Sequence, residues 1–360
     1  MTTGSPAMID SPALAQLCQA LAERAGDLPT IDQWPAWQLQ ECARSNVFTW
    51  FIPRNLGGLG LADEAILRGY LQLSQSCLTT SFILTQLMGG ATRIAASENQ
   101  ALSARLLPDI LSGHSFATVA ISHLTTSRRH LSQPAVQATP TADGYRLDGY
   151  SAWVTAADRA QYVVTGASLP DEQQLLIVVP TSAPGFHTEQ PETLVGLSAS
   201  RTGRCEFHGV QLAAEWVLAG PRKNVLQSGR GVGTGGLQTS ALALGLTAAA
   251  LGFMESEARI RPSLEAPVVA LRAEWRQLRE QLLATAAGVG GHTSERLRRQ
   301  ANSLVLRATQ AALAAAKGAG YAERHPAGRW CREALFFLVW SCPQEVVNAN
   351  LCELAGLDSP

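Results

Sequence analysis

The chain has 360 residues, of which 46% are hydrophobic and 16% charged, and its formal net charge at pH 7 is −1. This length predicts two or three packed units, and the composition predicts a soluble protein with an extensive core. A nearly neutral chain lacks the basic surface of proteins that bind nucleic acids or anionic membranes, so neither is expected as a partner.

Three further features predict a cytoplasmic protein. No apolar run approaches the ~20 residues of a membrane-spanning helix. The opening stretch MTTGSPAMIDSPA lacks the basic-then-apolar order of a signal peptide. The seven cysteines are odd in number and include no C-x-x-C pair, which predicts free thiols in a reducing compartment and no metal site.

The first part of the chain is predicted to be helical. From about 11 to 112, apolar residues recur at spacings of three and four, as in LAQLCQALAERA and DEAILRGYLQLSQSC. The segment Ile52–Leu61 is too rich in Gly and Pro for a helix, so a loop is predicted there.

Strands are predicted from about 115 to 220. The runs FATVAIS, YRLDGYSAWVT, QYVVTGAS, QLLIVVP and RCEFHGVQL alternate or are β-branched, which predicts a small sandwich or barrel. In the second run, Asp148 and Gly149 are expected to form a turn. Trp153 and Thr155 stand two residues apart, so they are expected to point to the same side of a strand.

The rest of the chain, from about 225, is predicted to be helical again. Its segments are long and rich in Ala and Leu, as in SALALGLTAAALGFMESEA, and such faces allow helices to approach closely in a bundle or an oligomer core. The expected architecture is α+β, with an N-terminal helical domain (1–114), a central β-barrel or sandwich (115–222) and a C-terminal helical bundle (223–360).

The predicted order of the domains and three short sequence motifs indicate the same protein family. Ile52–Leu61 has the form Pro-x-x-x-Gly-Gly-x-Gly, and Gly144–Thr155 ends in Trp-Val-Thr after an Asp-Gly pair. Gly196–Thr202 and Phe207–Val210 follow in the last predicted strands. Together they resemble the acyl-CoA dehydrogenase superfamily along nearly the whole chain. The resemblance implies an FAD-dependent oxidoreductase that acts on CH–CH groups and assembles as a homodimer or homotetramer.

The resemblance also implies which residues contact the flavin ring. Trp153 is expected to pack on the ring and Thr155 to hydrogen-bond near its reactive nitrogen. An indole offers contact area to a flat ring and a hydroxyl satisfies a ring heteroatom. Ser122 and Ser127 stand at hydroxyl positions of the other flavin-facing strand. Taken alone, a Trp-x-Thr pair is more often part of a core, and Ser127 fits an exposed loop equally well.

The family segments that contact the distal part of FAD are altered. Arg259 and Arg261 stand in a shortened form of the Arg-x-x-Phe-Gly segment, which in the family reaches the cofactor of a neighbouring subunit. They are candidates to contact the pyrophosphate. The Gln-x-x-Gly-Gly motif is reduced to the run around Lys317 and Gly318.

The carboxylate base of the family is missing from its usual position. Arg332-Glu333 resembles the family's Arg-Asp pair, and counting on from it places Ser341 where the catalytic Glu is expected. A serine hydroxyl cannot act as this base unaided. Ser341 and Gln344 also fit a helix capping box. Glu345 is the candidate for a shifted base.

Two alternatives to the dehydrogenase stay open. A flavin-dependent monooxygenase or oxidase of the same fold needs no thioester base, and His123 is its candidate catalytic residue, although a histidine bonded to backbone is the commoner arrangement. A non-catalytic paralogue that serves as a partner subunit would account for the missing base. In either enzyme the expected partner is a small molecule, with an acyl-CoA as the candidate. The presence of bound flavin distinguishes both enzymes from the non-catalytic paralogue.

Overall fold

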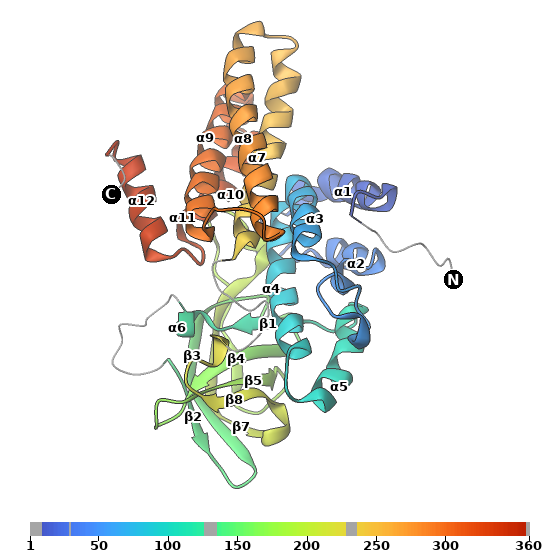
Figure 1. Ribbon diagram of the computed structural model, residues 1–360, viewed down its shortest axis with the longest axis vertical. Helices are drawn as coiled ribbons and strands as arrows, with labels where there is room; N and C mark the ends of the chain where they lie inside the picture. The colour runs from blue at the N-terminus through green and yellow to red at the C-terminus, as the bar shows by residue number, and fades with distance from the viewer. Residues whose placement is uncertain (1–8, 29, 126–134, 228–235, 358–360) are drawn as a thin grey trace.

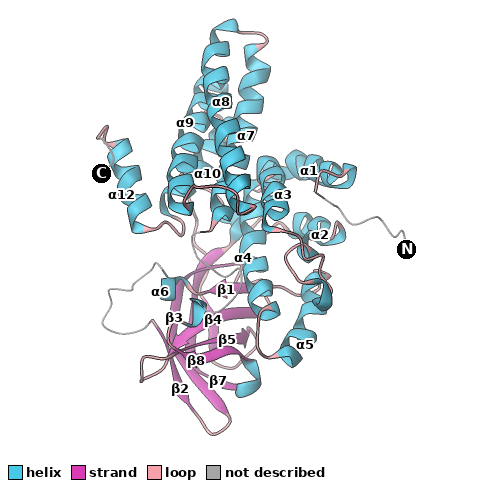
Figure 2. Ribbon diagram, viewed as in Figure 1, coloured by secondary structure: helices cyan, strands magenta, loops and turns pink. Residues whose placement is uncertain are grey.

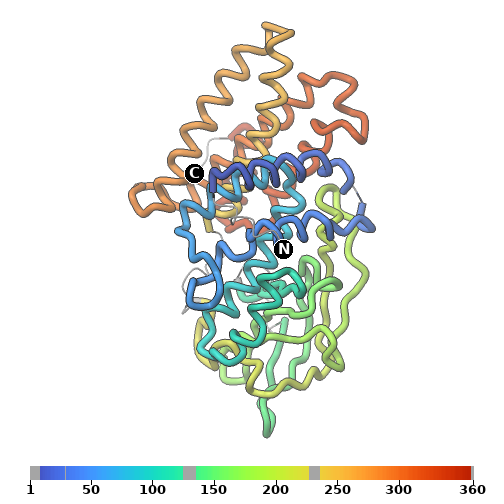
Figure 3. The backbone as a smooth tube through the Cα atoms, turned by 90° about the vertical axis from the view of Figure 1, so that its right-hand side faces the viewer, coloured from blue at the N-terminus to red at the C-terminus, as the bar shows by residue number. Residues whose placement is uncertain are grey.

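The computed structural model describes residues 9–28, 30–125, 135–227 and 236–357. Figure 1 shows three parts: a β unit at one end, long C-terminal helices at the other, and N-terminal helices beside their junction. In Figure 3 the first helices of the chain lie across that junction. The predicted fold class is confirmed, with a helical N-terminal part, a central sheet and a helical C-terminal part.

The N-terminal part consists of helices that bury apolar faces at the predicted spacing. Ser11 caps the first helix by accepting a hydrogen bond from the backbone of Leu14. Ile52–Leu61 is a loop with one 3-10 turn, in which a Cβ added at Gly58 would lie 1.9 Å from the Ile52 carbonyl oxygen. The helices are α1 (Pro12–Arg24), α2 (Ala36–Arg44), α3 (Asp63–Ser76), α4 (Leu78–Ala95) and α5 (Gln100–Leu111).

The β unit is one eight-stranded sheet in the order β6-β7-β3-β2-β4-β5-β8, with β1 paired to β4. Figure 2 shows the strands gathered in one unit. Alternate residues of the strands point inward and form a separate core that includes Leu147, Val163, Ile177 and Phe207. The strands are β1 (Ala117–Ala120), β2 (Val136–Pro140), β3 (Gly144–Thr155), β4 (Tyr162–Ser168), β5 (Gln174–Pro180), β6 (Phe186–Thr188), β7 (Thr202–Ala213) and β8 (Val217–Arg222), and the short helix α6 (Ser122–Thr125) follows β1.

The turn expected at Asp148 and Gly149 is wrong, because β3 runs unbroken through both residues. The pairing of β3 with β7 instead shifts register between Leu147 and Asp148, as at a β-bulge. Gly149 has φ +121°, and a Cβ there would lie 2.1 Å from the Ala135 carbonyl oxygen. Asp148 accepts a hydrogen bond from the Gly209 amide at 2.9 Å. The polar pair therefore lies inside a long strand and does not end it.

The C-terminal helices pack on the N-terminal helices as well as on one another. α7 lies against α3, where Ser74 donates a hydrogen bond to the Leu242 carbonyl at 2.7 Å. A Cβ added at Gly245 would lie 2.6 Å from the Ser74 side chain, so this glycine sets how closely the two helices approach. The helices are α7 (Leu237–Ala258), α8 (Glu265–Ala286), α9 (Ser294–Gly320), α10 (Pro326–Ala334), α11 (Phe336–Val339) and α12 (Gln344–Leu354).

The expectation that no segment matches a membrane helix needs correction at α7. By length and composition this helix could cross a membrane, with a mean hydropathy of 1.5 over its most apolar window, but 67% of that window is buried inside the protein. Its apolar residues pack against neighbouring helices, and the core helix of a soluble protein passes the same test.

Candidate functional site

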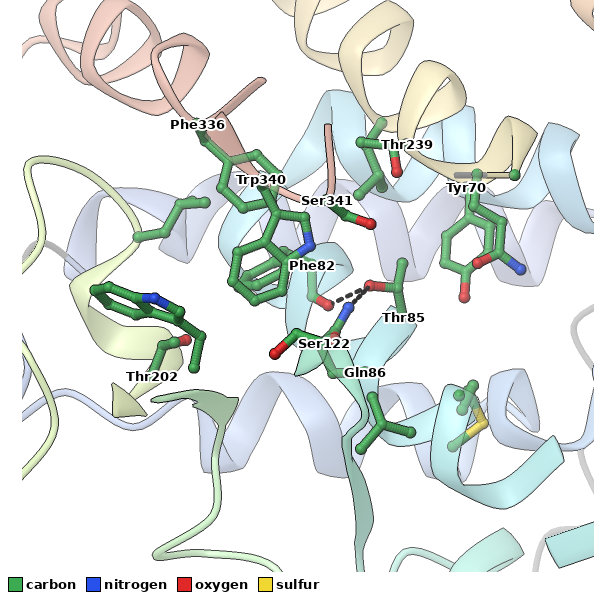
Figure 4. A pocket seen from close by; sticks show the side chains of 18 of the residues that line it. Tyr70, Phe82, Thr85, Gln86, Ser122, Thr202, Thr239, Phe336, Trp340 and Ser341 are labelled. Atoms are coloured by element: carbon green, nitrogen blue, oxygen red, sulfur yellow. Dashed lines mark hydrogen bonds between the residues drawn. The ribbon is translucent and has the colours of Figure 1, made fainter. Parts of the chain in front are cut away.

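A cavity of about 970 Å³ lies where the three parts of the molecule meet. This volume is at the upper end of the range for small-molecule sites. Its wall combines apolar and aromatic side chains with a few hydroxyl and amide groups (Figure 4). The wall residues used below are Asp63, Tyr70, Phe82, Arg93, Ser122, Trp153, Thr202, Thr239, Phe336, Trp340, Ser341 and Cys342.

Trp153 lines the cavity from the end of β3. Its side chain is 46% exposed, which is unusual for the largest apolar side chain in a well-packed chain. The neighbouring Val154 is fully buried in the β core. Trp153 is therefore not a core tryptophan, because its indole faces open space on the cavity side.

Thr155 stands behind the wall and reaches it through a neighbour. Its hydroxyl is buried and lies 2.9 Å from the hydroxyl of Thr202, which lines the cavity. The Ser200 hydroxyl lies 2.9 Å from Thr202 on the other side, and Thr118 donates to the Thr155 carbonyl at 2.7 Å. These bonds hold the Thr202 hydroxyl in place beside the cavity.

Ser122 and His123 are adjacent in sequence but face different surroundings. Ser122, the first residue of α6, lines the cavity. The His123 ring is not part of the wall, and its Nε2 lies 2.9 Å from the Gly166 carbonyl oxygen on β4. Burial lowers the pKa of His123, and the bond to Gly166 acts against that shift. Ser127 lies outside the described residues.

Ser341 lines the cavity in a strained backbone conformation, with φ +44°. The predicted capping box is wrong: Pro343 is the N-cap of α12, and no side chain caps the helix. The helix therefore begins later than expected. Ser341 belongs instead to residues 335–342, which supply several residues of the cavity wall and are called the closing segment below. Glu345 lies exposed in the first turn of α12 and is not part of the wall.

A buried polar pair holds this closing segment. Arg298 on α9, only 2% exposed, donates to the Trp340 carbonyl at 2.9 Å and to the Asn302 side chain at 2.9 Å. Asn302 donates in turn to the Phe337 carbonyl at 2.9 Å. Burial lowers the pKa of Arg298 to about 10. Burial also raises the pKa of the nearby Cys342 thiol, and the Arg298 guanidinium acts against this rise.

Three aromatic rings join the N-terminal and C-terminal parts at the wall. Phe82 on α4 meets Phe336 and Trp340 edge-on, with ring centroids 4.7 and 4.8 Å away. Phe336 and Trp340 stack on each other at 5.5 Å. Figure 4 shows this cluster in the middle of the wall, beside Ser341. The rings give the cavity a rigid, apolar surface beside the hydroxyl group of Ser341.

Arg259 and Arg261 do not meet the other candidate residues within one chain. They follow the C-terminal end of α7, whereas the wall takes residues from its N-terminal end. The 22 residues of α7 span about 33 Å at 1.5 Å per residue. Arg261 donates to Glu257 and to the Ala315 carbonyl. A contact with FAD would therefore have to involve a second copy of the chain.

Sequence reasoning missed the contribution of α3 to the wall. Asp63, Ile66, Leu67 and Tyr70 follow the i, i+3, i+4, i+7 spacing of one helix face, and all four line the cavity. This spacing was visible in the run DEAILRGY, but it did not indicate which protein surface the face covers. Among the described wall residues, Asp63 is the only carboxylate and Arg93 the only cation. No group of His, Cys, Asp and Glu suited to hold a metal occurs within the described ranges.

No protein-family model matches the chain. The mitochondrial short-chain specific acyl-CoA dehydrogenase of Bos taurus is 24% identical over 361 aligned residues, which cover 92% of this chain and 87% of the bovine protein. A probable acyl-CoA dehydrogenase of Bacillus subtilis (strain 168), YngJ, is 25% identical over 219 residues, which cover 55% of this chain and 57% of YngJ.

Solved structures share the same architecture over the whole length. The glutaryl-coenzyme A dehydrogenase glutaryl-CoA complex superposes with a TM-score of 0.79 at 17% identity, covering 97% of both chains. An FAD complex of PigA superposes with a TM-score of 0.78 at 15% identity, covering 96% of this chain and 98% of that one. With the motifs around Ile52–Leu61 and Gly144–Thr155, these similarities show that the chain resembles the acyl-CoA dehydrogenase superfamily in sequence and shares its fold.

Proposed function

We propose that the protein is an FAD-dependent oxidoreductase that acts on CH–CH groups of an acyl thioester or a similar small molecule. The observation that carries this proposal is Trp153, a tryptophan 46% exposed on the wall of a cavity of about 970 Å³. A flat, largely apolar ring system is the ligand that such an indole accommodates best. Relatives named as acyl-CoA dehydrogenases and a neighbour described as an FAD complex support the same cofactor.

The residues present fit the ring half of FAD. Trp153 would pack on the ring, and the Thr202 hydroxyl, fixed by Thr155 and Ser200, would bond to its polar edge. The Ser122 hydroxyl, on α6, would also hydrogen-bond to the polar edge of the ring. When bound, FAD accepts the hydride that leaves the substrate carbon. The aromatic cluster around Phe82 and Trp340 excludes water from that side of the cavity.

The first test is the visible absorption spectrum of the purified protein before and after loading with excess FAD and desalting. We expect retained flavin bands in the wild type and at least tenfold weaker FAD binding in Trp153→Ala. Trp37→Ala is the matched control, since Trp37 packs under Arg24 and is not part of the wall. Equal FAD affinity in Trp153→Ala and the wild type would remove Trp153 from the flavin site.

A flavin-dependent monooxygenase or oxidase is the second candidate, and one observation favours it. Ser341 occupies the expected position of the base, and Glu345 is not part of the cavity wall. Asp63, the single carboxylate among the described wall residues, comes from α3 and not from that segment. Anaerobic reduction of the bound flavin by an acyl-CoA would favour the dehydrogenase. Reaction of the chemically reduced flavin with oxygen, without such reduction, would favour the second candidate.

A protein that takes up no FAD would instead fit a non-catalytic partner subunit. Missing flavin bands after loading, in a sample whose cooperative unfolding shows that it is folded, would decide in favour of that role.

We also propose that the protein acts in the cytoplasm as a homodimer or homotetramer. Support for self-association comes from the exposed leucines on and after α12, namely Leu351, Leu354 and Leu357. Figure 1 shows α12 standing apart from the long helices. Exposed apolar residues gathered on one element are typical of a surface that a partner covers.

A further inference from the structure

The Tyr70 side chain is the most deeply buried polar group on the α3 side of the cavity. It is 1% exposed and lines the cavity. Within the described part of the chain its hydroxyl makes no hydrogen bond. Its neighbours on α3 that share the wall, Ile66 and Leu67, are apolar, and the Phe51 ring lies 5.5 Å from the Tyr70 ring. Burial raises the pKa of Tyr70, so the phenol stays neutral.

A hydroxyl in such surroundings favours a ligand that bonds to it. A buried polar group without a partner costs about 1–3 kcal/mol. Water can hydrogen-bond to the Tyr70 hydroxyl while the cavity holds no ligand, but a ligand that fills the cavity displaces that water. A hydrocarbon chain would then leave the phenol without a partner, whereas a chain that carries an oxygen atom would not.

Charges on the wall indicate that this oxygen belongs to a neutral group. Asp63 lies two helical turns before Tyr70 on the same face of α3 and would repel a carboxylate. The only cation among the described wall residues, Arg93, lies on α4 and donates to the Gly89 carbonyl at 2.8 Å. A dicarboxylic substrate is therefore disfavoured near Tyr70.

The position of Tyr70 suits the far end of a substrate that reaches the flavin. In Figure 4, Tyr70 and Thr202 lie on opposite sides of the view, and Phe82, Trp340 and Ser341 lie between them. Thr202 belongs to the hydroxyl chain that would hold the flavin ring. A molecule oxidised at the Thr202 side would extend past the aromatic cluster towards Tyr70.

We propose that Tyr70 is a specificity-determining residue that selects substrates with a neutral oxygen group on the chain, a hydroxyl, carbonyl or ether, over plain alkyl chains. This inference rests on the proposed function, because it treats the cavity as the site of an acyl substrate. The selection arises in the way that sites built to bond a hydroxyl reject analogues without one.

The test compares pairs of acyl-CoA esters of equal size. In each pair, one ester ends in a hydroxyl group and the other ends in a methyl group, as in 4-hydroxybutyryl-CoA and pentanoyl-CoA. Longer pairs cover the distance to Tyr70. Isothermal titration calorimetry gives the dissociation constants for both flavin-loaded and flavin-free protein. We expect the hydroxylated member to bind roughly 5- to 150-fold more tightly at one chain length, the range set by the cost of an unpaired hydroxyl. Tyr70→Phe should abolish that preference.

Tyr162→Phe is the matched control, because Tyr162 packs beside Trp216 on β4 and is not part of the wall. It should keep the preference of the wild type. Equal binding of both members at every length, or a preference that persists in Tyr70→Phe, would overturn the inference and leave the flavin proposal standing. Absence of flavin after loading would instead overturn the proposed function, and the titrations of flavin-free protein would still decide the role of Tyr70.

Discussion

The side chain of His123 shows how two adjacent residues can serve different purposes. Ser122 faces the cavity, but His123 turns towards the Gly166 carbonyl on β4. Sequence alone placed both near the flavin, because a motif aligns positions and does not fix where each side chain points. The buried ring is held neutral, since burial lowers its pKa below the ordinary value of 6.5.

This shift predicts a pH dependence of stability. A histidine whose pKa is lower in the folded state stabilises the fold fully above pH 6.5, and the contribution falls as the pH drops towards the folded-state pKa. Between pH 7 and 5 we expect the free energy of unfolding of the wild type to fall more steeply than that of His123→Gln, by no more than about 1.4 kcal/mol per pH unit. Urea unfolding at several pH values measures both slopes. Parallel slopes would contradict the prediction.

At the scale of elements, Trp153 lies within an irregularity of β3, between Ser151 and Val154. Register shifts occur on both sides of Gly149, before Asp148 and between Ser151 and Val154. Bulges re-aim the side chains that follow them. The sequence showed an Asp-Gly pair, which also fits a hairpin turn, and only the pairing with β7 distinguishes the two.

Gly149→Ala should therefore destabilise the protein by at least about 2 kcal/mol, from left-handed strain together with a clash. The Cβ would lie 2.1 Å from the Ala135 carbonyl oxygen, at φ +121°. Gly252→Ala is the control: nothing lies within 4 Å of a Cβ at this position in α7, so the change should be neutral or stabilise by about 0.5–1 kcal/mol. Urea midpoints of the two variants test this contrast. Similar midpoints would show that the strand tolerates the bulge without glycine.

For the whole molecule, the order of the three parts could be read from the sequence because hydrophobic periodicity changes near 112 and 225. The side of the cavity formed by Trp153 and Ser122 could be predicted in part, since both residues stand in motifs. The side of the cavity formed by α3 could not be predicted from the sequence. Asp63 and Tyr70 acquire their role from the packing of α3 beside α4 and α7, and no local pattern encodes that contact.

Self-association is a prediction at the same scale. Replacing Leu351 and Leu354 together by Glu places charges on the exposed face of α12 and should reduce the molar mass measured by sedimentation velocity. Asn348→Glu, also exposed on α12, is the control and should leave the mass unchanged. A wild type that sediments as a monomer at micromolar concentration would contradict the prediction.

The distribution of wall residues also sets the order of events during synthesis. The cavity takes side chains from Phe51 to Cys342, so the ribosome must pass residue 342 before the wall is complete. Domains fold largely in the order in which they emerge. The β unit, with its own core, can form while Trp153 still faces water, and the closing segment around Trp340 arrives last. Completion of the cavity wall is thus a late step of folding, because it needs the segment around Trp340 as well as the β unit.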